Sequence, residues 1–180
     1  MRGLIIFLVV LSSGLISAQE NIGATTFHRM LIFNEKQELL VVKLKNHDLW
    51  VTPGLYQSHK QTLKQGIDSI ASTYGMKTSN IQLRGIYGLI NPAKSTFSTR
   101  NIFTMRLKSE LKYLPDIIED FRWVSLNQAD KLINIPHINE FIKDIIDNPD
   151  NVRSGTVEIK VIEIRRTHQI IEKFYSITNN

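Results

Sequence analysis

Apolar residues occur along this chain in two spacings, one typical of strands and one typical of helices. Short stretches rich in valine, isoleucine, leucine and aromatic residues, bounded by turn-forming residues, favour β-strands. The first two stretches flank the turn Asn34-Glu35-Lys36 and therefore predict a hairpin. The predicted strands cover residues 25–34, 37–45, 50–52, 81–90, 101–107, 121–124 and 156–164.

A spacing of three and four residues predicts one long central helix over about residues 60–74. Its apolar residues form a continuous stripe, and lysines, serines, a threonine and an aspartate occupy the opposite face. Gly75 follows at the position where a C-terminal cap is expected. The stripe consists of Leu63, Ile67, Ile70, Ala71 and Tyr74.

Together these elements predict an α/β protein in which helices cover a mixed sheet of five to seven strands. The length of 180 residues and the hydrophobic content of 42% suit a single domain with its own core. The remaining segments are late helices at 126–132 and 137–146, a polar loop at 91–100, a break at 148–151, and a segment at 169–177 that fits a helix or a strand equally well.

The first 18 residues have the pattern of a secretory signal peptide. Met1-Arg2 is positively charged, residues 4–11 form an unbroken apolar run, and small residues lead to Ala18. The apolar run is short for a membrane span. We therefore expect cleavage after Ala18 and export to the periplasm or the medium, with retention of the segment as a membrane anchor as the alternative.

The composition excludes several kinds of chemistry. The chain has no cysteine, so disulfides, thiolate metal sites and a cysteine nucleophile are ruled out. The net charge is +5, but the basic residues are scattered, which favours a solvated surface over a nucleic-acid interface. The five histidines lie far apart in the sequence, without the spacing of metal ligands.

A frame of glycine and aliphatic residues with fixed spacing runs through residues 49–89. Trp50-Val51-Thr52-Pro53-Gly54 opens it, and the residues Gly54, Ile70, Gly75 and Met76 keep its spacing. This frame resembles the box of the Nudix hydrolases: Gly, five residues, Glu, seven residues, then Arg-Glu-aliphatic-x-Glu-Glu-x-Gly-aliphatic. Leu55 stands where the family usually has a second glycine. Residues 121–126 also resemble the strand and turn before the last helix of that family.

The resemblance implies a Nudix-like α/β/α sandwich over residues 19–150, followed by a C-terminal extension, 151–180, of unknown role. It also implies an activity, the attack of water on a diphosphate linked to another group. In the family, glutamates on the box helix hold a divalent ion such as Mg²⁺, which neutralises phosphate charge and activates water.

The residues that would hold this ion are missing from the sequence. Lys60 stands at the first glutamate position, Asp68 at the arginine position, and Ser69, Ser72 and Thr73 at the remaining glutamate positions. Hydroxyls are neutral and weak ligands for Mg²⁺. We therefore expect no metal site and an inactive relative, with Mg²⁺ or Mn²⁺ needed only if a divergent hydrolase mechanism survives.

Three interpretations of these substitutions remain open. The first is a polar, solvated helix face. The second is a cleft that binds phosphate without metal, for which the candidate residues are Gly54, Lys60, Lys64, Arg84 and Arg100. The third is relocated catalysis by the later acids Glu110, Glu119 and Asp120, although no spacing supports that choice.

Three functions follow from these interpretations. One is an exported ligand-binding or interaction module for a phosphorylated small molecule, a nucleotide derivative or a protein. Another is a divergent hydrolase that cleaves nucleoside diphosphate derivatives. The third is a structural or host-interaction protein that uses the basic tail, which contains Arg153, Lys160, Arg165 and Arg166.

Overall fold

The computed structural model describes residues 23–162 and 165–178, so the predicted signal peptide lies outside the described residues. Within them, nine strands form one sheet, and no helix is long and apolar enough to span a membrane. The helices are α1 (Leu63–Ser72), α2 (Leu126–Leu132) and α3 (Pro136–Asp147). The strands are β1 (Gly23–Phe33), β2 (Leu39–Leu44), β3 (Trp50–Val51), β4 (Gly54–Tyr56), β5 (Lys77–Asn91), β6 (Thr96–Ser109), β7 (Ile118–Val124), β8 (Arg153–Ile162) and β9 (Arg165–Ser176).

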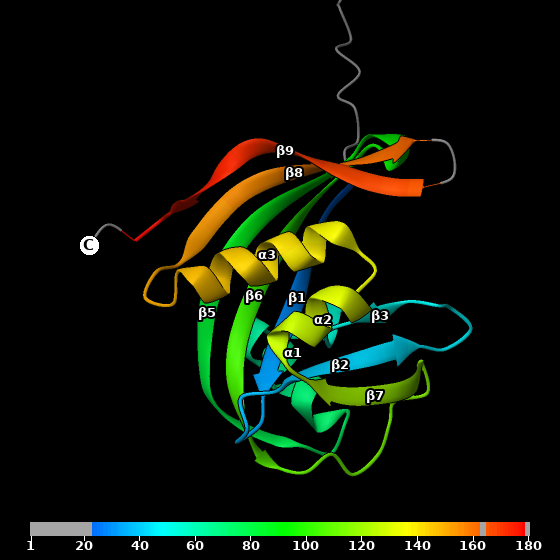
Figure 1. Ribbon diagram of the computed structural model, residues 1–180, viewed down its shortest axis with the longest axis vertical. Coiled ribbons are helices and arrows are strands. Elements are labelled where there is room, and N and C mark those ends of the chain that lie inside the picture. Colours follow the sequence, from blue (N-terminus) through cyan, green and yellow to red (C-terminus); the bar gives the residue numbers. More distant parts are fainter. Residues whose placement is uncertain (1–22, 163–164, 179–180) are drawn as a thin grey trace, which may run out of the picture.

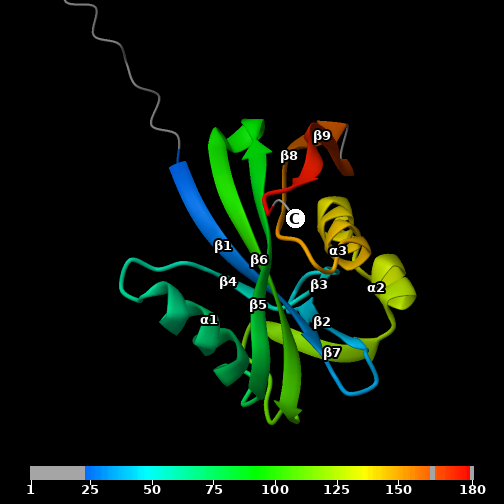
Figure 2. The same ribbon diagram turned by 90° about the vertical axis from the view of Figure 1, so that its left-hand side faces the viewer.

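The sheet is mixed and lies between two layers of helices. Its strand order is β3-β2-β1-β6-β5-β8-β9, with β4 paired to β1 and β7 paired to β2. The pairs β1–β6 and β5–β8 are parallel, and the other pairs are antiparallel. α1 covers one face, and α2 and α3 cover the other (Figure 1, Figure 2). The predicted α/β/α sandwich is therefore confirmed.

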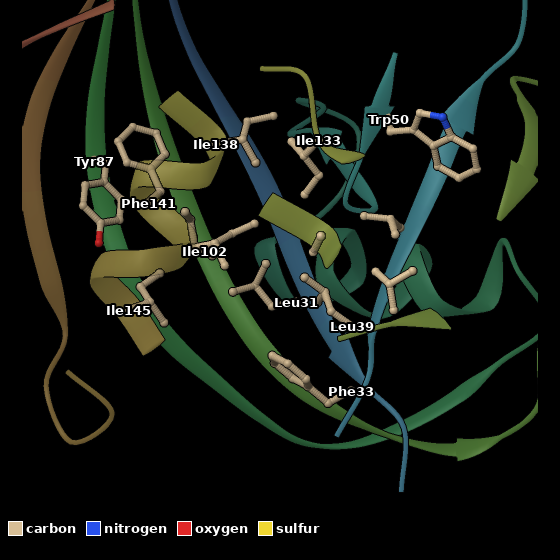
Figure 3. Packing of buried hydrophobic residues seen from close by; sticks show 14 of the residues in the cluster. Leu31, Phe33, Leu39, Trp50, Tyr87, Ile102, Ile133, Ile138, Phe141 and Ile145 are labelled. Atoms are coloured by element: carbon tan, nitrogen blue, oxygen red, sulfur yellow. The ribbon is translucent and has the colours of Figure 1, made fainter. Parts of the chain in front are cut away.

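β1 contributes to the cores on both faces of the sheet. Successive side chains of a strand point to opposite faces. Met30 and Ile32 accordingly pack in the core under α1, whereas Leu31 and Phe33 pack in the core under α2 and α3. The second core, shown in Figure 3, also contains Trp50, Tyr87, Ile102, Ile138, Phe141 and Ile145.

α1 begins at Leu63, later than the predicted start at residue 60, because Thr62 caps it. The Thr62 side chain accepts a hydrogen bond from the backbone N–H of Gln65, and the Gln65 side chain accepts one from the backbone N–H of Thr62. Leu63 is consequently exposed and does not belong to the buried stripe, which begins further along at Ile70. Gly75, with φ of 65°, ends this region in the left-handed conformation expected of a C-terminal cap.

Two predictions around the strands were wrong. Residues 91–100 are not a polar loop: a short turn, Pro92–Lys94, leads directly into β6 at Thr96. The polar residues of this strand pair across the sheet, as the hydroxyl of Thr25 does when it donates to Ser98 at 2.9 Å. Pro53-Gly54 does not end the extended chain either, because β4 continues it and pairs with β1.

The C-terminal segment extends the main sheet. β8 pairs with β5 and β9 pairs with β8, so the undecided segment 169–177 is mainly strand (Figure 1). The hairpin of β8 and β9 is joined to α3 and β5 by the nearly buried carboxylate of Asp144 on α3. Asp144 accepts hydrogen bonds from the Tyr87 hydroxyl at 2.7 Å and from the Arg153 guanidinium at 2.9 Å. β8 is thus bonded to β5 through its strand pairing and to α3 through Arg153.

Candidate functional site

The positions of α1 that match the glutamates of the box carry hydroxyl groups bonded to the helix itself. The Ser69 hydroxyl donates to the carbonyl oxygen of Gly66 at 2.8 Å, and the Ser72 hydroxyl donates to that of Ser69 at 2.9 Å. Thr73 does the same to Ile70 at 2.7 Å. Each hydroxyl hydrogen is therefore directed at the preceding turn, and none of these side chains carries a negative charge.

The charged residues near α1 do not replace the missing acids. Lys60 is exposed in the loop before the helix, and Asp68 pairs with Lys64 one turn away. Mg²⁺ requires several hard anionic oxygens in an octahedral arrangement. In residues 23–162 and 165–178, no group of three His, Asp or Glu side chains lies close enough to hold a metal ion. The residues present do not fit the divalent ion that the resemblance implies.

Gly54 keeps its position in the box because two strands meet there closely. A Cβ atom at residue 54 would lie 2.6 Å from the carbonyl oxygen of His28 and 2.6 Å from the ring of Phe27. These separations are far inside van der Waals contact, so only glycine lets β4 approach β1 in this way. The approach places the Phe27 ring directly against the backbone of the box entrance.

Two arginines lie over the Phe27 ring. The Cζ atoms of Arg29 and Arg100 are 5.1 and 4.9 Å from its centroid. Arg100 also lies over the ring of Tyr56, at 5.7 Å, and Tyr56 meets Phe27 edge-on at 4.9 Å. Phe27 of β1 is the register partner of both Tyr56 in β4 and Arg100 in β6, three strands that are seen together in Figure 2. We call Phe27, Arg29, Tyr56 and Arg100 the arginine–aromatic cluster.

The Arg29 guanidinium is buried and bonded only to neutral oxygens. Its Nη1 atom donates to the carbonyl oxygen of Thr52 at 3.1 Å and to the hydroxyl of Thr52 at 2.9 Å. Burial, and after it the charge of Arg100, lower the pKa of Arg29 to about 9, so the side chain is still charged at neutral pH. In the described part of the chain neither Arg29 nor Arg100 forms an ion pair, and the Nε atom of Arg100 is buried without a hydrogen-bond partner.

On the opposite face of β1, a buried histidine ties the strand to the loop before α1. Nε2 of His28 donates to Oε1 of Gln57 at 2.8 Å, and Asn101 lies 3.5 Å from Nδ1 of the same ring. The Gln57 amide in turn donates to the carbonyl oxygens of Ser58 and Gln61. These bonds fix the path of the chain between β4 and α1.

The structure brings together only part of the predicted ligand-binding set. Gly54 and Arg100 both contact Phe27. Lys60 and Lys64 are exposed near the start of α1, on the face of the sheet opposite Arg29. Arg84 lines a separate cavity of about 270 Å³ between β5, β6 and the end of α3.

The three later acids considered for relocated catalysis lie in different surroundings. Glu119 pairs with Lys43 at 3.0 Å, and Asp120 lies 3.7 Å from Arg122. Glu110 instead lines a cavity of about 510 Å³ next to the turn between β1 and β2. No pair of acids for general acid–base chemistry emerges from them.

Arg29, Phe27 and Tyr56 were missed as site residues in the sequence. A signal was present, because Arg29 has the strand parity of Leu31 and Phe33, whose side chains are both buried. A charged residue at an inward-facing strand position requires an explanation. The second arginine of the cluster, Arg100, is 71 positions away in the sequence. Its proximity to Arg29 follows only from the pairing of β1 with β6.

Sequence comparison and structure comparison give different results for this chain. No family model matches the sequence, and no curated protein does so either. Among solved structures, the mutator MutT protein from Bacillus halodurans matches with a TM-score of 0.62 at 14% identity, over 82% of this chain and 97% of that one. The MutT protein from Methanosarcina mazei matches with a TM-score of 0.58 at 18% identity, over 72% of this chain and 98% of that one.

A third solved structure with this fold contains a ligand. The Nudix domain of Shewanella oneidensis NrtR, solved with ADP ribose, matches with a TM-score of 0.57 at 16% identity, over 71% of this chain and 89% of that one. Together these likenesses show that the chain has the fold of the Nudix hydrolases. At such low identity they concern the fold alone, so the function has to be argued from the residues of the site.

Proposed function

We propose that this protein is an exported, non-hydrolytic Nudix-fold protein that binds a phosphorylated small molecule or nucleotide derivative without a divalent metal. The observation that carries the proposal is the state of the box helix, where Ser69, Ser72 and Thr73 replace the carboxylates and donate to helix carbonyls. One electrostatic contact at a reacting centre is worth roughly 3–4 kcal/mol. Loss of the whole ligand set therefore removes the metal-dependent reaction.

The choice of ligand class rests on charge and on the fold. The arginine–aromatic cluster offers two positive charges, and anions are the natural partners of such a site. The NrtR Nudix domain, which has the same fold, was solved with ADP ribose. Nucleotide derivatives are therefore the first ligands to test.

Hydrolysis and binding assays separate this proposal from the divergent hydrolase. The purified protein is expected to release no product from ADP-ribose or nucleoside triphosphates with Mg²⁺ or Mn²⁺ present. Neither ion is expected to raise its melting temperature, whereas a bound ligand should raise it by linkage. Turnover that depends on Mn²⁺ would establish the hydrolase instead.

Export is a separate part of the proposal, supported by the signal pattern of residues 1–18. N-terminal sequencing of the protein from a bacterial envelope fraction or culture medium is expected to give a chain that starts at Gln19. An intact N-terminus in a membrane fraction would indicate the anchored form.

A further inference from the structure

The arginine–aromatic cluster holds two positive charges, and neither has an acidic partner among residues 23–162 and 165–178. Like charges repel, and burial removes the water that would screen them. Burying an unpaired charge costs several times what one cation–π contact returns. The stacking of Arg29 on Phe27 therefore does not balance its burial, and among the described residues no acidic group pairs with either arginine of the cluster.

We propose that the cluster binds a phosphoryl or pyrophosphoryl group of the ligand, with Arg29 and Arg100 supplying the positive charge that holds it. This inference rests on the proposed function, because it names the group by which the ligand is held. A guanidinium donates two parallel hydrogen bonds to phosphate oxygens, which gives both charge and orientation.

The environment of each arginine assigns it a different part in binding. Arg29 is held by Thr52 and forms the inner wall, since its exposed fraction is only 8%. Arg100 is more exposed than Arg29, so a ligand that approaches from solvent would meet its guanidinium first, although its Nε atom is buried without a partner. Tyr56 is 57% exposed and leaves the cluster open to solvent on its side.

A purely structural role for the two arginines makes a different prediction. In that case their stacking would only cover the Phe27 ring, and added anions would bind no better here than elsewhere on the basic surface. A binding site instead requires that affinity falls when either guanidinium is removed and that it survives without metal.

Isothermal titration calorimetry of the purified protein, in EDTA and without phosphate buffer, tests whether the cluster is an anion-binding site. Inorganic pyrophosphate and ADP-ribose are expected to bind and to compete with each other. Arg100→Gln should weaken both by about tenfold or more, because a hydrogen bond to a charged group is lost. Arg100→Lys keeps the positive charge but lacks the paired N–H donors of a guanidinium, so it should give an intermediate affinity.

Arg122→Gln is the matched control. Arg122 also stacks on an aromatic ring, 4.5 Å from the centroid of Trp50, but it lies outside the cluster. Its loss should leave both affinities unchanged, whereas an equal loss in Arg122→Gln and Arg100→Gln would overturn the inference in favour of non-specific attraction. The inference also fails if neither probe binds, or if pyrophosphate binds Arg100→Gln as tightly as the parent.

Arg29→Met is the second variant, and circular dichroism should confirm its fold. If ADP-ribose binds but both Arg100→Gln and Arg29→Met retain full affinity, the proposed function stands and this location is wrong. If Mn²⁺-dependent hydrolysis appears while Arg100→Gln still loses pyrophosphate affinity, the location stands and the non-hydrolytic function is wrong.

Discussion

Arg29 is a single residue whose burial is unfavourable for stability, and the proposed binding site gives its charge a role. Its guanidinium is buried at the edge of the core, its two hydrogen bonds go to neutral oxygens of Thr52, and its charged neighbour is Arg100. Effective desolvation penalties for such a group amount to several kcal/mol. Gly54 makes the arrangement possible, since it allows β4 to lie against Phe27 beneath the two arginines.

Replacing Arg29 by methionine should therefore stabilise the protein while it abolishes anion binding. Removal of the buried charge is favourable, and the loss of donors to Thr52 offsets about 1 kcal/mol of the gain. We expect the free energy of unfolding at neutral pH to rise by roughly 1 kcal/mol, by analogy with other replacements of buried charges. Urea unfolding in phosphate-free buffer measures it. A fall of several kcal/mol would mean that Arg29 is held by a favourable interaction.

Tyr74 provides a test at alkaline pH. Burial raises its pKa above the ordinary value, so the folded state keeps a neutral phenol while the unfolded chain ionises above pH about 10. The stability due to this residue is fully present below that pH and is lost as the pH rises toward the folded pKa. The advantage of the parent over Tyr74→Phe should thus shrink between about pH 8 and pH 11, by up to roughly 1 kcal/mol per pH unit above 10. Urea unfolding at both pH values measures this difference, and a difference that stays constant with pH would contradict the prediction.

At the scale of elements, the sequence predicts what repeats locally and misses what depends on pairing. The α1 stripe was predictable because Ile70, Ala71 and Tyr74 recur at helical spacing. The first half of β6 could not be predicted in this way. Its serines and threonines form a strand here because they pair with the neighbouring strand β1, which the local sequence does not reveal. β4 was not predicted because Pro53 was expected to end the extended segment. The changed residues of the box could be identified from the sequence because its spacing is local.

The box helix itself allows a gain-of-function test. A combined Lys60→Glu, Ser69→Glu, Ser72→Glu and Thr73→Glu variant places a carboxylate at each glutamate position of the box. Residues 69, 72 and 73 are three and four positions apart and share a helix face, and residue 60 lies in the loop before α1. Millimolar Mn²⁺ should raise its melting temperature by a few degrees and leave the parent unchanged, since metal binding stabilises only the folded state. The same four positions changed to glutamine provide the control of equal size without charge. If Mn²⁺ stabilises the parent as strongly, the metal site was never lost.

On the scale of the whole molecule, the C-terminal hairpin is part of the main sheet. β8 supplies a parallel partner for β5, and Val157 is fully buried in the core under α3. Phe174 of β9 meets both Tyr87 and Phe141, whose rings stack at 4.2 Å. The resemblance implied a Nudix-like sandwich over residues 19–150 and left the role of residues 151–180 unknown, so the place of this hairpin in the sheet could be found only from the three-dimensional structure.

The Asp144–Arg153 pair is the polar link that should decide whether the hairpin stays attached. Both side chains are nearly buried, with exposed fractions of 9% and 12%, and Asp144 also accepts the Tyr87 hydroxyl. Asp144→Asn leaves the Arg153 charge buried and unpaired, so we expect a loss of about 3–5 kcal/mol in the free energy of unfolding. The exposed pair Lys143–Asp147, on the same helix, provides the control, because Asp147→Asn should change the free energy of unfolding far less than Asp144→Asn. Hydrogen exchange shows where the Asp144→Asn variant opens: the amides of β8 and β9 should lose protection before those of β1 and β6. Equal small losses in the two variants would mean that apolar packing alone holds the hairpin against α3.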